Sequence, residues 1–163
     1  MNLKDPFDNK KNSKNYLLKN GKLINIKEKK IENKDILLEN KKIKQIKKEI
    51  NISSKDLEVI DCDGLMIAPG FVDMRVNIGE PGSEHKETIK SVSMSAASGG
   101  ITSLICMPNT SPPIDQPAII QSIQRKAREV ALSKFYCTGC ITRGATGKEI
   151  CELQLMKESG AVG

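Results

Sequence analysis

The sequence predicts an α/β fold in which a small β-rich domain precedes a parallel sheet covered by helices. After Gly70, continuous apolar strand patterns alternate with helical patterns, which is typical of a parallel sheet with helices on its faces. Before that point, short strand patterns flank turn signals, which is typical of hairpins. We therefore expect a frayed N-terminus over residues 1–14, a β-rich domain over 15–67 and an α/β domain over 68–163.

The β-rich domain is expected to consist of short hairpins. Asn20-Gly21 lies between the strand patterns 16–18 and 23–26, and this dipeptide predicts the turn of a first hairpin. A second hairpin is expected from strands 35–39 and 42–46, joined at Asn40-Lys41. One more strand is expected at 57–62.

The α/β domain is expected to hold three βα units. The predicted strands are 71–77, 101–107 and 135–141, and the predicted helices are 86–98, a helix opening at 115–117, and 148–159. Gly99-Gly100 is a typical helix end, and Pro117 is typical of a helix start. Residues 158–163 look like the start of a fourth strand. Because three βα units cannot close a barrel, we expect the chain to be the N-terminal part of a longer protein.

The net charge of +6 comes from the first third of the chain. Residues 1–60 hold sixteen lysines, no arginine and nine acidic residues, and the rest of the chain is close to neutral. No aromatic residues are interleaved for base stacking, so we interpret the lysines as a solvated surface and expect no nucleic-acid partner. No apolar stretch approaches the length of a membrane span or a signal peptide, so a cytoplasmic location with no membrane partner is expected.

Five cysteines leave one unpaired thiol in any disulfide scheme, which favours a reducing compartment. Cys137 and Cys140 have the C-x-x-C spacing of zinc and redox sites. This motif stands alone, without a second C-x-x-C or a nearby histidine, and lies in an apolar run. We therefore predict buried, inert thiols rather than a metal or redox site.

The most informative motif lies in residues 68–82. Pro69-Gly70 starts a strand in which Asp73, Arg75 and Asn77 are expected to share one face, because side chains alternate along a strand. In metal-dependent amidohydrolases this segment reads P-G-x-x-D-x-H-x-H, and its two histidines bind metal. The chain resembles a class I dihydroorotase, whose version continues H-x-H-x-R-x-P-G.

This resemblance implies that residues 68–163 form the first three βα units of a (β/α)8 TIM-type barrel, and that active relatives use zinc. Arg75 and Asn77 stand at the family's metal-ligand positions, and Gly79 stands at the position of its substrate-binding arginine. A guanidinium stays protonated, and a neutral amide is a poor zinc ligand. We therefore expect no catalytic residue, no metal and no cofactor in this segment, as in a non-catalytic branch that lacks the H-x-H motif.

Three further segments resemble the family. Asn109, in the phrase M-P-N-T, is at a position that binds the substrate's carboxylate region, although it could equally cap the turn after Pro108. His85 lies in an E-H-K-E-T phrase, and we favour a helix-start residue over a loop residue at the mouth of the site. The Gly-rich loop at 142–149 matches no phosphate-binding motif and is expected to be an ordinary loop.

The leading hypothesis is a catalytically impaired dihydroorotase-like protein of de novo pyrimidine biosynthesis. Its expected role, by resemblance, is that of a structural partner of aspartate carbamoyltransferase or a homo-oligomer, and a small-molecule substrate is doubtful. One alternative is an active dihydroorotase or related cyclic amidohydrolase, hydrolysing a ring C–N amide bond with an atypical metal site. The other alternative is a non-enzymatic assembly scaffold.

Overall fold

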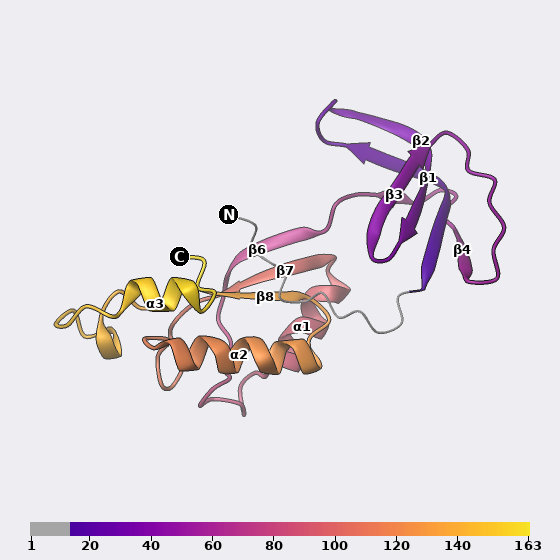
Figure 1. Ribbon diagram of the computed structural model, residues 1–163. Helices are drawn as coiled ribbons and strands as arrows, with labels where there is room; N and C mark the ends of the chain where they lie inside the picture. The colour runs from indigo at the N-terminus through magenta and orange to yellow at the C-terminus, as the bar shows by residue number, and fades with distance from the viewer. Residues whose placement is uncertain (1–13) are drawn as a thin grey trace. The chain divides into compact units, whose positions relative to one another are not determined.

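The computed structural model describes residues 14–163, so the predicted frayed segment 1–14 lies almost entirely outside the described residues. The chain divides into two compact units between Pro69 and Gly70 (Figure 1). The first is an all-β unit and the second is an α/β unit. No helix within residues 14–163 is long and apolar enough to cross a membrane.

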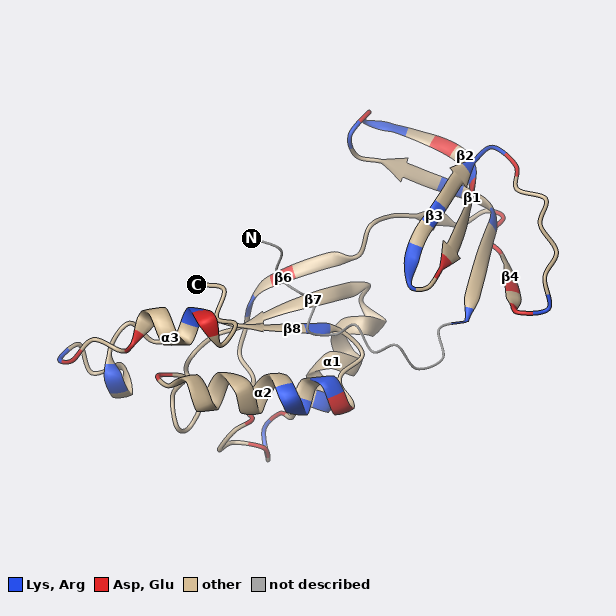
Figure 2. Cartoon of the chain, viewed as in Figure 1, with Lys and Arg blue, Asp and Glu red and all other residues tan. Residues whose placement is uncertain are grey.

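The β-rich unit is one mixed sheet in the order β3-β2-β1-β4, with β5 paired to the outer half of β1. Its strands are β1 (Asn15–Asn25), β2 (Lys30–Glu39), β3 (Lys42–Lys47), β4 (Leu57–Asp61) and β5 (Met66–Ile67). Leu17, Leu37 and Ile50 are buried together on one face of this sheet. The edge strand β3 carries Lys42, Lys44 and Lys47 (Figure 2). Lysines on an edge strand commonly protect it from pairing with other chains.

The predicted hairpin turn at Asn20-Gly21 is wrong, because β1 runs through both residues without reversing. The register shifts between Leu18 and Gly21, so Asn20, with φ 63°, belongs to a β-bulge. The backbone N–H of Asn20 donates to Oδ1 of Asp35 on β2 at 2.9 Å. The chain turns instead at residues 26–29, beyond the last β1–β2 pair.

The second predicted hairpin is confirmed. Asn40 and Lys41 have φ values of 51° and 62° and connect β2 to β3, as a two-residue type I′ turn requires. A second bulge, opposite Leu37 and Leu38, explains why Ile43 and Ile46 do not alternate regularly in the sequence.

The α/β unit holds a three-stranded parallel sheet in the order β6-β7-β8. Its elements are β6 (Phe71–Val76), α1 (Ile89–Ser98), β7 (Ile101–Cys106), α2 (Pro117–Val130), β8 (Lys134–Cys137), a 3-10 turn at Arg143–Ala145, and α3 (Leu153–Glu158). Helix α1 packs against β7, and α2 packs against β8, α1 and α3 (Figure 1). Leu104, Phe135 and Ile120 are fully buried in the core between sheet and helices.

Local signals in the sequence mark the boundaries of the first two helices. Thr88 caps α1, and its hydroxyl accepts from the backbone N–H of Ser91 in a capping box. Gly99 ends α1, and Gly100 follows with φ 75°. Pro117 is the first residue of α2. The predicted helix 86–98 is therefore shorter by its first three residues, because the capping threonine stops it.

The third βα unit departs from prediction. The predicted strand 135–141 ends at Cys137, and the predicted helix 148–159 is helical only from Leu153. The cause is a local pairing across residues 141–151, in which the Cys151 N–H donates to the Ile141 carbonyl at 2.9 Å. As expected for a further strand, Ala161 forms a parallel bridge with Cys137.

Candidate functional site

Three segments meet at the carboxyl edge of the parallel sheet. The N–H of Met107 donates to the carbonyl of Val76 at 2.9 Å, and the N–H of Thr138 donates to that of Cys106 at 3.0 Å. Each segment that follows a strand is therefore held beside its neighbour. In parallel barrels, reacting groups lie at this edge, so residues 77–88, 107–116 and 138–152 form the candidate site.

Strand β6 is bulged just before this edge, and the bulge corrects one prediction. Asp73 pairs with Leu104 and Val76 pairs with Cys106, so β6 has one residue more than β7 over this interval. Because Leu104 and Cys106 are both buried on the helix side, Asp73 and Val76 share that side. The expected common face of Asp73, Arg75 and Asn77 is thus wrong for Asp73.

Arg75 and Asn77 flank Val76 and therefore lie on the other face of the sheet, and both are exposed. The bulge is supported by the Arg75 N–H, which donates to Oδ1 of Asp73 at 3.0 Å. Within residues 14–163 no group of three or more His, Cys, Asp or Glu side chains is arranged to hold a metal ion. A guanidinium and an amide do not fit the donor set that zinc requires.

Gly79, where the resemblance implies a substrate-binding arginine in the family, is enclosed by backbone. Its carbonyl accepts from the N–H of Ser83 at 2.6 Å. A Cβ added to Gly79 would overlap the carbonyl oxygens of Ser83 and Glu87. The loop that follows β6 is thus folded tightly around a position without a side chain.

The loops that follow β6 and β7 are in direct backbone contact. The N–H of Ser111 donates to the carbonyl of Pro81 at 3.1 Å, and Gly82, with φ 93°, lies directly against the Ser111 carbonyl. Thr110 is buried, and its hydroxyl donates to the Pro112 carbonyl at 2.7 Å. Asn109 is exposed on this braced loop, so its proposed substrate contact stays a prediction.

His85 is exposed in a turn closed by the Lys86 N–H and the Ser83 carbonyl, at 2.9 Å. This turn comes before the cap residue Thr88, so His85 precedes the helix rather than opening it.

Sequence reasoning missed the role of Asp115. Its Oδ2 accepts from the N–H of Gly144 at 2.8 Å, which ties the segment before α2 to the loop after β8. That loop holds two successive residues with positive φ, Gly144 at 59° and Ala145 at 56°. The only sign of this contact in the sequence was the acidic residue Asp115 shortly before Pro117, and an acidic residue is also common at an ordinary helix start.

All five cysteines are free and buried. Cys106 and Cys137 pair across β7 and β8, and a hydrogen bond between their thiols lowers the pKa of Cys106 and raises that of Cys137. Burial raises the pKa of Cys140 and of Cys151. These environments favour thiols over thiolates at Cys137, Cys140 and Cys151.

We predict that Cys140 and Cys151 alkylate slowly in the native protein, because the reactive thiolate is scarce at neutral pH. Iodoacetamide labelling, read by mass spectrometry, should be slow in buffer and fast in denaturant. Rapid labelling of Cys140 in the folded protein would show a reactive thiol there.

Comparison with known proteins decides the family. The sequence profile of the family described as dihydro-orotase-like matches residues 64–163, more than half of the chain. The chain belongs to the dihydro-orotase-like family. The match covers the complete parallel sheet and all three of its following segments.

Two similar proteins are named dihydroorotase. The chain is 44% identical to the dihydroorotase of Caldicellulosiruptor saccharolyticus and 43% identical to that of Aquifex aeolicus, in each case over 90% of this chain and 34% of the relative. It therefore spans about a third of the length of these relatives.

Solved structures show the fold. L-hydantoinase (dihydropyrimidinase) from Arthrobacter aurescens matches with a TM-score of 0.78 and 28% identity, over 91% of this chain and 32% of that one. A D-hydantoinase matches with a TM-score of 0.64 and 25% identity, over 78% of this chain and 27% of that one. The α/β unit is thus the first part of an amidohydrolase-type (β/α)8 barrel, as the sequence predicts.

Proposed function

We propose that this chain is the N-terminal part of a dihydroorotase-like protein of de novo pyrimidine biosynthesis that has lost the family's metal-dependent catalysis. The names of its relatives support the pathway. Arg75 supports the loss of catalysis, and it is the observation on which the proposal depends.

The electrostatic reason is direct. Arg75 lies at the end of β6, where the resemblance implies a metal ligand, and its guanidinium is positive at any physiological pH. At an effective dielectric constant of 20, two unit charges about 4 Å apart interact by about 4 kcal/mol, and a divalent ion doubles this repulsion. Asn77 has a neutral amide oxygen where the resemblance implies a histidine imidazole, and the amide is the poorer zinc ligand.

The substrate side of the site is weakened as well. An arginine clamp on a carboxylate is strong because its two parallel hydrogen bonds are charge-assisted. Gly79 supplies no such clamp, and the surrounding backbone leaves no room for one. Asn109 alone would hold the carboxylate region of dihydroorotate through a neutral amide, so we expect weak binding at most.

The remaining role is structural. We propose that the protein is a cytoplasmic partner of aspartate carbamoyltransferase, with a homo-oligomer as the other assembly. The support is the resemblance of the D-M-R-V-N-I segment to the non-catalytic branch, together with the substitutions at all three site positions.

The test is an assay of the complete gene product, expressed with and without aspartate carbamoyltransferase from the same organism. We expect no ring opening of dihydroorotate with added zinc, and a stable complex with the transferase by size-exclusion chromatography with light scattering. Ring opening that disappears with a chelator would contradict the loss of catalysis. A complete protein that never associates with the transferase would contradict the partnership.

The second candidate is an active dihydroorotase with an atypical metal site. The high identity to proteins named dihydroorotase favours it. Such an enzyme would take its metal ligands from residues outside the segments described here, and the same chelator-sensitive activity would establish it.

A further inference from the structure

The β-rich unit carries a projecting ribbon whose two faces differ in character. We call residues 21–34 the arm: the outer halves of β1 and β2 with their connecting turn (Figure 1). Strand β5 pairs with β1 at the base of the arm, Met66 opposite Lys22 and Ile67 opposite Leu23. Because paired residues share a face and successive strand residues alternate, these registers assign every paired residue of the arm to one of two faces.

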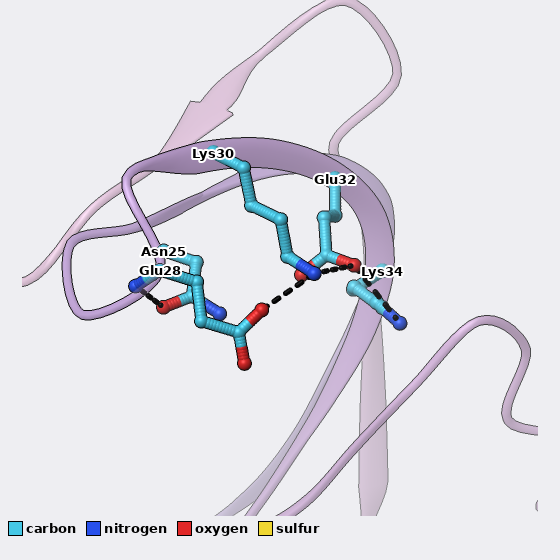
Figure 3. Close-up of polar contacts among 5 residues, drawn as sticks. All are labelled: Asn25, Glu28, Lys30, Glu32 and Lys34. Carbon is cyan, nitrogen blue, oxygen red and sulfur yellow. Dashed lines mark hydrogen bonds and ion pairs between the residues drawn. The ribbon is translucent and has the colours of Figure 1, made fainter.

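One face of the arm is largely polar, although Leu23 also lies on it, and its charged side chains pair with one another. Asn25 pairs with Lys30, and Glu32 and Lys34 lie on the same face. Lys30 forms ion pairs with Glu28 and, at 3.4 Å, with Glu32, which also lies 3.6 Å from Lys34 (Figure 3). The hydrogen bond from Lys30 to Glu28 raises the pKa of Lys30. Both carboxylates of the arm are thus engaged with lysines within the arm.

The opposite face is mostly apolar, and it is exposed among residues 14–163. Ile24 pairs with Ile31 on this face, and Met66 extends it at the base. Ile31 is 58% exposed and Met66 is 66% exposed, and Ile26, the first residue of the turn after β1, is also 66% exposed. A two-stranded ribbon with an open apolar face is only marginally stable by itself, and such a face is typical of an interaction surface.

Within the arm, the charged side chains on or next to this apolar face are lysines. Lys22 lies on the face, and Lys27 and Lys29 follow in the turn, where all three are exposed. Neither carboxylate of the arm belongs to this face, since Glu28 and Glu32 are paired on the other. A second copy of the chain would bring lysines against lysines, so a rim of the opposite sign on a different protein fits better.

We propose that the apolar face of the arm (Lys22, Ile24, Ile31, Asn33 and Met66), together with Ile26 of the adjoining turn, docks onto an apolar protein surface rimmed by Asp and Glu side chains. The isoleucines and Met66 supply the desolvated centre, and the lysines supply orientation and association rate. This inference rests on the proposed structural role, because it identifies the surface through which the protein would hold its partner.

The experiment measures binding of the complete gene product to aspartate carbamoyltransferase from the same organism. Two variants probe the arm: Lys27→Glu with Lys29→Glu, and Ile31→Thr. Two matched controls lie outside it: Lys48→Glu with Lys55→Glu, and Ile52→Thr, all at exposed positions of the same unit. Circular dichroism melts compare the folding of every variant with that of the wild type.

We expect both arm variants to weaken binding about tenfold or more, and both controls to bind like the wild type. We also expect wild-type affinity to fall with added salt, and the lysine variant to lose much of this dependence. Protection of Met66 from peroxide oxidation in the complex would place the interface on this face.

The contrary results are distinct. Equal binding by arm variants and wild type overturns the docking surface and leaves the partnership standing. Absence of any wild-type complex overturns both. Protection of Met66 in the uncomplexed monomer, dimerisation that the arm variants abolish, or arm-dependent binding to phosphatidylserine vesicles would each show that a different occupant covers the face.

Discussion

Replacing Asp35 with alanine is expected to lower the free energy of unfolding of the β-rich unit by about 3 kcal/mol. Asp35 is only 2% exposed, and its carboxylate accepts from the N–H groups of Asn20 and Ile50, each at 2.9 Å. Alanine would leave both donors without their charged acceptor. The bulge at Asn20 and the loop that carries Ile50 would loosen together.

Denaturant unfolding of the complete protein, combined with hydrogen exchange of peptides from residues 15–25 and 45–52, measures this effect. Asp63→Ala is the matched control, because Asp63 is exposed in the same unit, and its effect should stay within about 0.5 kcal/mol. If neither peptide exchanges faster in the Asp35→Ala variant than in the wild type, Asp35 does not join the bulge to the loop.

The substitution Gly79→Arg, at the position where the resemblance implies an arginine, is expected to destabilise the α/β unit rather than to create substrate binding. The new Cβ would overlap the carbonyl oxygens of Ser83 and Glu87, and backbone atoms cannot move aside as a flexible side chain can. Forced overpacking of this kind typically costs about 1–3 kcal/mol.

Thermal unfolding and dihydroorotate binding by calorimetry together test this expectation. Gly99→Arg is the control, because a Cβ at Gly99 meets no atom closer than 3.6 Å and its φ is −91°. An unchanged melting temperature for Gly79→Arg with a gain of ligand affinity would mean that the loop opens easily. In that case, the site would fail to bind substrate only because position 79 has no side chain.

Local sequence patterns predicted most of the fold because they coincide with the tertiary structure. The Asn40-Lys41 turn, the Gly99-Gly100 helix end and Pro117 at the start of α2 all depend on backbone preferences that act locally. Asn20-Gly21 failed because the same left-handed preference suits a bulge as well as a turn. The contact between Asn20 and Asp35, which is distant in sequence, decides between them.

The site was less predictable for the same reason. The residue types at positions 75, 77 and 79 could be compared with the family motif directly. The bulge that separates Asp73 from Arg75 depends on pairing with β7, and the enclosure of Gly79 depends on how residues 83–87 fold back. Neither leaves a periodic signal in the sequence. The tie between Asp115 and Gly144 likewise joins two loops from separate βα units.

Metal content shows whether Arg75 keeps a divalent metal from the end of β6. The complete protein is purified with excess zinc, dialysed and measured by inductively coupled plasma mass spectrometry, beside the double variant Arg75→His with Asn77→His. We predict no stoichiometric zinc at this position in the wild type, and zinc affinity higher by about tenfold or more in the double variant. Zinc located beside Arg75 by anomalous scattering from wild-type crystals would show that the guanidinium does not exclude the metal.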